Sequence, residues 1–135
     1  MTEKPKGGGR DSRQDFRVDM AISLRYKVAS KIGGGAYQLS PYMRGIGVNF
    51  SGGGGAFKIG KDIPAGSFIY LEMYFPFDRF PVSAVAEIIR TKPDTLRGKA
   101  VFLCITRYLL ISPTIQDKMV AYFIGEGARR RKAEG

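Results

Sequence analysis

The chain has 135 residues, 44% of them apolar, which suffices for one hydrophobic core but leaves no room for a second domain of the usual size. Its 22 basic and 12 acidic residues give a net charge of +10, and a charge of this sign favours anionic partners such as nucleotides, nucleic acid or acidic membrane. The single cysteine excludes an intrachain disulfide and a thiolate zinc site, and the absence of histidine removes the commonest general base. We therefore expect a binding protein, not an enzyme, without a metal or cofactor.

The N-terminal stretch Met1–Ser12 contains consecutive glycines among charged residues and shows no apolar periodicity. Such a segment cannot offset its ordering entropy by burial, and we expect it to be mobile when nothing is bound. No run of the sequence approaches the roughly 18 apolar residues of a membrane span, and the first residues are too polar for a signal peptide. The sequence therefore predicts a cytoplasmic protein without membrane insertion.

The first predicted strand covers Phe16 to Val28, where apolar and polar residues alternate throughout. Its apolar face should cover the core, which leaves Arg17 on the solvated face; this apolar set is Phe16, Val18, Met20, Ile22, Leu24, Tyr26 and Val28. A second extended run, from Tyr37 to Ser51, ends with an alternating apolar set of Ile46, Val48 and Phe50. This alternation predicts that Asn49 and Ser51 point outward together.

Further strands are predicted at Ala56–Ile59, Phe68–Phe75, Val82–Thr91 and Lys99–Thr106. The second of these should turn one apolar face to the core, made of Ile69, Leu71, Met73 and Phe75. A turn is expected at Lys92–Asp94 because the segment contains a proline. The last strand is apolar at every position from Val101 to Ile105, so both of its faces should be covered, one of them by the helix that follows.

A helix is predicted after the last strand. Ser112 suits an N-cap, Pro113 suits the first helical position, and apolar residues then recur at helical spacing, at Ile115, Met119 and Phe123. We expect the helix to end at Gly125. The chain is then divided into a tail at 1–9, one domain at 10–124 and a basic, solvated tail at 125–135.

The pattern as a whole indicates an all-β fold. Six strands, mostly connected as a meander, would leave exposed edges in an open sheet, and closure into a barrel removes them. We therefore predict a six-stranded antiparallel β-barrel with a C-terminal α-helix.

Two polar motifs stand at the ends of predicted strands. Arg13 and Arg17 form an R-x-x-x-R motif where the N-terminal tail meets the first strand, and Asn49, Ser51 and Gly54 form an N-x-S-x-x-G motif where the next strand ends. If these strands are antiparallel neighbours, the start of one lies beside the end of the other. The two motifs would then form a single site.

The residue types in these motifs suit a dianionic purine ligand. A guanidinium group can grip a phosphate or the N7 and O6 edge of guanine, and its flat face can stack on a base. An amide or hydroxyl side chain can serve a base edge or a phosphate oxygen. Glycines let the main chain approach a ligand closely and adopt positive φ, which exposes backbone N–H groups to an anion.

The order of the two motifs, separated by one hairpin, resembles the signature of PilZ domains, and the similarity covers roughly residues 10–124. It implies a PilZ-type β-barrel of bacterial second-messenger signalling that binds cyclic diguanylate (c-di-GMP) and does no chemistry on it. Arg13 and Arg17 would clasp the phosphates and guanines. The remaining implied contacts come from the second motif and the tail: Asn49, Ser51 and Gly54, with Arg10, Gly52 and Gly53 in addition.

Three departures from the family pattern affect this expectation. Asn49 lacks the charge that an aspartate offers to the guanine N1 and N2 donors, so the affinity should be lower. The bend at Gly52–Gly55 is richer in glycine than a typical turn, and ordering it should cost more entropy. With no second domain predicted, any output must pass through a separate effector protein.

Two other functions fit parts of the sequence. One is an interaction module with the same barrel that binds no nucleotide. The other is a barrel that binds single-stranded RNA or DNA, suggested by the positive charge and by aromatic residues among basic ones. Nucleic acid is the less favoured partner.

Several residues have a plainer interpretation beside the functional one. Arg10 and Arg44 are further candidates for phosphate contacts, although surface solubility explains both. Cys104, in an all-apolar strand, is interpreted as a small core residue rather than a redox switch. An aromatic platform for bases is the alternative to ordinary packing for Tyr70, Tyr74, Phe77 and Phe80.

Overall fold

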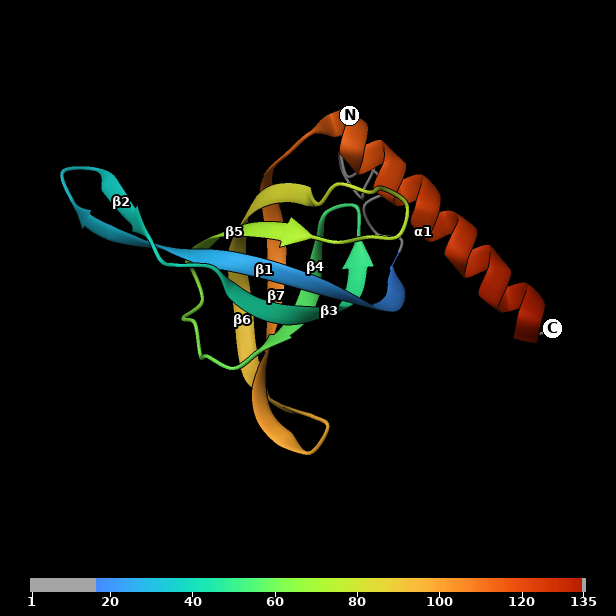
Figure 1. Ribbon diagram of the computed structural model, residues 1–135, viewed down its shortest axis with the longest axis horizontal. Helices are drawn as coiled ribbons and strands as arrows, with labels where there is room; N and C mark the ends of the chain where they lie inside the picture. The colour runs from blue at the N-terminus through green and yellow to red at the C-terminus, as the bar shows by residue number, and fades with distance from the viewer. Residues whose placement is uncertain (1–16, 135) are drawn as a thin grey trace, which may run out of the picture.

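The computed structural model describes residues 17–134, which form seven strands and one helix (Figure 1). The elements, in chain order, are β1 (Val18–Gly33), β2 (Ala36–Leu39), β3 (Met43–Ser51), β4 (Gly54–Ile59), β5 (Phe68–Met73), β6 (Val82–Leu96), β7 (Lys99–Ile111) and α1 (Pro113–Glu134).

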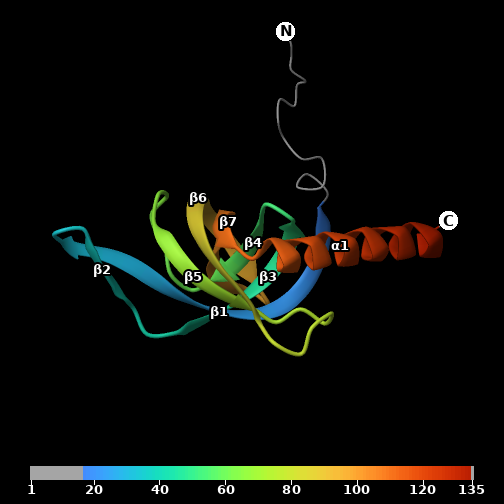
Figure 2. The same ribbon diagram turned by 90° about the horizontal axis from the view of Figure 1, so that it is seen from above.

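Six of the strands close into an antiparallel barrel. The order of hydrogen-bonded neighbours is β2-β1-β3-β4-β7-β6-β5, and β1 also pairs with β5, which joins the two ends of the sheet. β2 lies outside the barrel and pairs with β1. Seen from above, the β1–β2 hairpin projects from one side of the barrel and α1 extends on the opposite side (Figure 2). The predicted six-stranded barrel with a C-terminal helix is thus confirmed.

The extra strand β2 comes from a division of the predicted run between Tyr37 and Ser51. Ser40 interrupts it by bonding back to β1: its backbone N–H donates to the Val28 carbonyl at 2.9 Å, and its hydroxyl accepts the Val28 N–H at 2.9 Å. Pro41 follows and has no N–H for a ladder. The long strand β1 therefore pairs with β3 through its first part and with β2 through its end.

The core is formed by the inward faces of the strands and is closed at one end by α1. The apolar face predicted for the run 68–75 is confirmed, since Ile69, Leu71 and Met73 of β5 and Phe75, just after it, are all buried. Phe50 of β3, Phe75 and Phe123 of α1 form an aromatic cluster, with ring centroids 4.9 Å apart for Phe50 and Phe75 and 5.7 Å for Phe75 and Phe123. Edge-on ring contacts of this kind stabilise a core beyond simple burial.

The helix begins as the sequence predicts and ends later. The Ser112 hydroxyl accepts the Ile115 N–H at 3.4 Å, as an N-cap does. Met119 and Phe123 are buried, but the helix packs on β1 and β3, so the expectation that it covers β7 was wrong. The expected end at Gly125 was also wrong, because α1 continues to Glu134. A helical glycine costs only about 1 kcal/mol, and the strong helix formers that follow offset it.

No helix in the described part of the chain has the length and apolar character needed to cross a bilayer.

The inward face of β3 differs from the predicted alternation. A β-carbon on Gly45 would lie 2.8 Å from Ile59 Cγ2, and one on Gly47 would lie 2.2 Å from Phe50 Cζ, so both glycines face the core. Ile46, between them, therefore faces outward. The pairing with β4 shifts register between Gly47 and Asn49, and this irregularity returns Phe50 to the core. The assignment of Ile46 to the core was wrong because a bulge cannot be read from the alternation alone.

The turn between β6 and β7 also lies elsewhere than predicted. Pro93 stands inside β6, opposite Phe102, and the two-residue turn is at Arg97 and Gly98. Both turn residues have positive φ, 52° and 80°, as the favoured hairpin turns require. Proline is tolerated here because this part of β6 pairs with β7 but has no second neighbour in the sheet.

Candidate functional site

Arg17 and Asn49 meet at the edge where β1 begins and β3 ends. The Arg17 Nη1 atom donates a hydrogen bond to Asn49 Oδ1 at 3.1 Å. The Asn49 Nδ2 atom in turn donates to Asp19 Oδ1 at 2.7 Å, and Asp19 stands directly opposite Asn49 in the β1–β3 ladder. The predicted proximity of these two motif residues is thus found, whereas Arg10 and Arg13 lie outside the described residues, as does the rest of the N-terminal tail.

Asp19 was missed by the sequence analysis. The signal was present, because residues two apart on a strand share a face, and Asp19 therefore shares the outer face with Arg17. Its carboxylate fixes the orientation of the Asn49 amide, with the amide oxygen toward the guanidinium group. The three side chains form one exposed chain of donors and acceptors.

Ser51 does not point outward as predicted. Only 2% of the residue is exposed, and its hydroxyl turns into the glycine bend. The hydroxyl accepts the Gly53 N–H at 3.3 Å and donates to the Gly54 carbonyl at 3.4 Å. A serine in this position stabilises a tight turn by substituting for a backbone group.

The glycine bend is tightly packed, contrary to the expectation that it is loose. A β-carbon on Gly54 would lie 2.2 Å from the Thr106 carbonyl oxygen, and one on Gly55 would lie 2.7 Å from the Phe50 ring. The expected positive φ is absent from all of Gly52–Gly55. Gly54 is therefore required for the close approach of β4 to β7 and Gly55 for the packing of β4 against Phe50, and neither is needed for a left-handed backbone.

Two residues distant in sequence hold the bend in place. The Thr106 hydroxyl donates to the Gly55 carbonyl at 2.8 Å and accepts the Gly55 N–H at 3.3 Å. The Gln116 Nε2 atom of α1 donates to the Gly52 carbonyl at 2.5 Å. Neither residue was predicted to take part, because nothing local in the sequence connects them to the bend.

A second polar cluster surrounds Glu72 on β5. Its carboxylate accepts hydrogen bonds from Arg25 Nε at 2.7 Å, from the Tyr42 hydroxyl at 2.8 Å and from the Tyr70 hydroxyl at 3.1 Å. Burial by itself raises the pKa of Glu72, but the three donors outweigh it, and the pKa lies below its ordinary value. The Arg25 guanidinium also lies 3.9 Å from the centre of the Tyr42 ring. This cluster stabilises the pairing of β1 with β5.

The aromatic residues proposed as a platform for bases do not form an exposed row. Tyr70 is engaged with Glu72 and Ser83, and Phe77 stacks on Phe75 with ring centroids 5.4 Å apart. The packing interpretation therefore holds for both. Cys104 is fully buried, and burial raises the pKa of its thiol to about 12, which agrees with a core residue.

Comparison with known proteins identifies the family. The family model of the PilZ domain matches residues 11–124. No curated protein matches the sequence. The family consists of receptor and adaptor modules, and no catalytic family is indicated.

Two solved structures share the fold at low sequence identity. The inhibitor of motility MotI/DgrA from Bacillus subtilis superposes with a TM-score of 0.66 at 18% identity, over 86% of this chain and 51% of that one, so this chain spans about half of its length. The PilZ domain of YcgR from Escherichia coli, solved with c-di-GMP, superposes with a TM-score of 0.51 at 18% identity, over 86% of this chain and 95% of that one. The chain, which matches the family model over nearly its whole length, belongs to the PilZ domain family.

Proposed function

We propose that the protein is a c-di-GMP receptor of the bacterial cytoplasm that passes the signal to a separate effector protein. The observation that carries the proposal is the contact between Arg17 and Asn49, which joins the two sequence motifs at one exposed edge of the barrel. Support comes from membership of the PilZ family and from the c-di-GMP complex of the YcgR domain.

The ligand would be held mainly by guanidinium groups. Arg13 and Arg17 would clasp its phosphates and guanines, with Arg10 as an additional contact, because planar guanidinium donors match both groups. Gly52, Gly53 and Gly54 would allow the ligand to approach the bend closely. Ser51 would contribute through the same bend, since its hydroxyl is engaged there.

Asp19 offers a replacement for the charge that Asn49 lacks. The guanine N1 and N2 donors are best met by a carboxylate, and the Asp19 carboxylate lies directly beside the Asn49 amide. A guanine edge placed over this pair would meet both an amide oxygen and a carboxylate. The loss of affinity expected from asparagine at position 49 would then be smaller than the sequence alone suggests.

The bend also provides a route from the ligand to the rest of the molecule. Gln116 ties the Gly52 carbonyl to the first turns of α1. A ligand that displaces the bend would alter this contact and with it the position of α1 relative to the barrel. The effector would then recognise a surface that includes the helix.

Isothermal titration calorimetry with c-di-GMP tests the receptor assignment. The wild type should bind, and Arg17→Ala should bind at least about tenfold more weakly, because a charge-assisted hydrogen bond to phosphate is lost. Arg90→Ala is the matched control, since Arg90 is an exposed arginine on β6 outside the motifs, and it should bind like the wild type. Absence of heat with the wild type, or equal affinity of Arg17→Ala, would contradict the proposal.

A further inference from the structure

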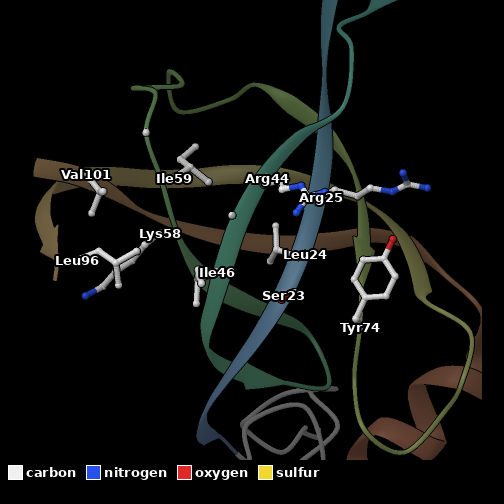
Figure 3. A pocket seen from close by; sticks show the side chains of 12 residues that line it. Ser23, Leu24, Arg25, Arg44, Ile46, Lys58, Ile59, Tyr74, Leu96 and Val101 are labelled. Carbon is white, nitrogen blue, oxygen red and sulfur yellow. The ribbon is translucent and has the colours of Figure 1, made fainter. Parts of the chain in front are cut away.

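A groove of about 700 Å³ lies on the face of the barrel formed by β1, β3 and β4 (Figure 3). Ser23 of β1 stands opposite Ile46 of β3, and Ile46 stands opposite Lys58 of β4. Leu96 and Val101, from the β6–β7 hairpin, line the far end of the groove. Its volume falls within the range of pockets that bind small molecules.

The groove contains two arginines that face each other. Arg25 and Arg44 are direct partners in the β1–β3 ladder, and like charges in this position destabilise a sheet. Arg25 is compensated by Glu72, which accepts a hydrogen bond from its Nε at 2.7 Å. The exposed guanidinium of Arg44 has no hydrogen bond or ion pair with any residue between 17 and 129. Arg44 is therefore a positive charge without a partner, in a groove that also contains the positive charge of Arg25.

Lys58 adds to the positive charge of the groove but is partly compensated. Its Nζ donates to the Thr95 carbonyl at 2.8 Å and lies 3.6 Å from the Asp94 carboxylate. In Figure 3 the Arg44 side chain lies in the middle of the groove, with Tyr74 on one side and with Leu96 and Val101 on the other. The free positive charge is thus central, and the compensated charges lie toward the ends.

The rest of the lining is suited to an apolar group. Ile46 faces outward between Ser23 and Lys58, and Leu96 and Val101 are half-buried beyond it. The Ser23 hydroxyl is exposed and, within the described part of the chain, has no hydrogen-bond partner. Free donors in the middle of the groove and apolar side chains toward one end match a ligand with an anionic head and an apolar body.

We propose that this groove is a second ligand site, which binds a small organic phosphate through Arg44 and Ser23. A tetrahedral phosphate can accept hydrogen bonds from several directions at once, which suits donors on two different strands. The apolar body would lie over Ile46 toward Leu96 and Val101. The site is distinct from the Arg17–Asn49 edge, because Ser23 lies six positions along the chain from Arg17, up to about 20 Å in an extended strand.

Nuclear magnetic resonance titration of the full chain with phenyl phosphate tests this inference. The backbone amides of Gly45 and Gly60, which line the groove, should shift on titration, while that of Gly54 in the bend should not. Inorganic phosphate should cause the same shifts with about tenfold weaker affinity, because it lacks an apolar body to bury. Absence of shifts at both groove glycines, or equal affinity for the two compounds, would overturn the proposal.

A pair of arginine variants completes the test. Arg44→Gln should weaken phenyl phosphate binding about tenfold, because a hydrogen bond to a charged group is lost. Arg90→Gln, which removes an exposed arginine outside the groove, should leave binding unchanged. Equal binding by wild type and Arg44→Gln would overturn the assignment. The outcome is independent of c-di-GMP, because the reporting glycines and the probe differ from those of the receptor test.

Discussion

Gln116 of α1 donates a hydrogen bond to the carbonyl of Gly52, with 2.5 Å between nitrogen and oxygen, although 64 residues separate the two in sequence. Gly52 is buried, so its carbonyl cannot easily turn to water in place of this partner. The contact fixes the glycine bend against the helix at the edge of the barrel where the two sequence motifs meet.

Replacing Gln116 by alanine should destabilise the protein by about 1–2 kcal/mol, because it leaves a buried carbonyl unsatisfied. Urea denaturation of the wild type and the variant measures the difference in the free energy of unfolding. Gln38→Ala, on the exposed strand β2, is the matched control and should lie within about 0.5 kcal/mol of the wild type. Equal stability of Gln116→Ala and Gln38→Ala would show that the contact contributes nothing.

Gly54 should tolerate no side chain. A β-carbon there would lie 2.2 Å from the Thr106 carbonyl oxygen, which is backbone and cannot move without disturbing β7. We expect Gly54→Ala to lose about 3 kcal/mol or more, as overpacking against main chain does. The control is Gly60→Ala, where a β-carbon meets open space and φ is not positive, so stability should stay the same or rise slightly.

Thermal denaturation distinguishes these two glycine variants directly. If Gly54→Ala melts at the same temperature as Gly60→Ala, the close approach of β4 to β7 is not a constraint on this position.

The barrel could be predicted from the sequence because alternation is a local property. In β5, apolar residues alternate with Tyr70 and Glu72 from Ile69 to Met73, and the inward set was correct at each of these positions. In β3, the same reasoning failed at Ile46, because a bulge reverses the two faces and is set by the pairing with β4. The turn at Arg97 and Gly98 was missed because the proline at position 93 was the stronger local signal, although an edge segment tolerates it.

The candidate site, like the barrel, could be predicted from the sequence only in part. The proximity of Arg17 to Asn49 follows from antiparallel pairing of the first two predicted strands, which the sequence could supply. The bend into which Ser51 turns is held by Thr106 and Gln116, which bond to Gly55 and Gly52 from more than 50 residues away. Contacts over such separations depend on the folded chain, and the alternation of apolar and polar residues does not predict them.

Glu72 should make stability depend on pH. The pKa of its carboxyl group in the folded protein lies below the ordinary value of 4.5, against the opposing effect of burial, because Arg25, Tyr42 and Tyr70 donate to it. Its contribution is therefore fully present above the unfolded pKa and is lost as the pH falls through the folded one.

Urea denaturation of the wild type and Glu72→Gln at pH 7 and near pH 3 measures this contribution. The wild type should be the more stable at pH 7, and the difference should shrink at the lower pH, where the carboxyl group becomes protonated. A difference that stays constant between the two pH values would show that charge on Glu72 plays no part.

Arg97 occupies a backbone conformation that arginine rarely adopts. Its φ of 52° is the only positive value among the non-glycine residues between 17 and 134, and it stands in the first position of the two-residue turn before Gly98. Asparagine is strongly preferred there, because its short polar side chain tolerates the left-handed region. Arg97→Asn should therefore raise the free energy of unfolding by about 0.5–1 kcal/mol.

Lys99→Asn is the control. It places the same residue on the adjoining strand, where φ is negative, and should give no gain in stability because asparagine is a poor strand former. If urea denaturation finds the two variants equally stable, the backbone conformation of Arg97 carries no strain that asparagine can relieve.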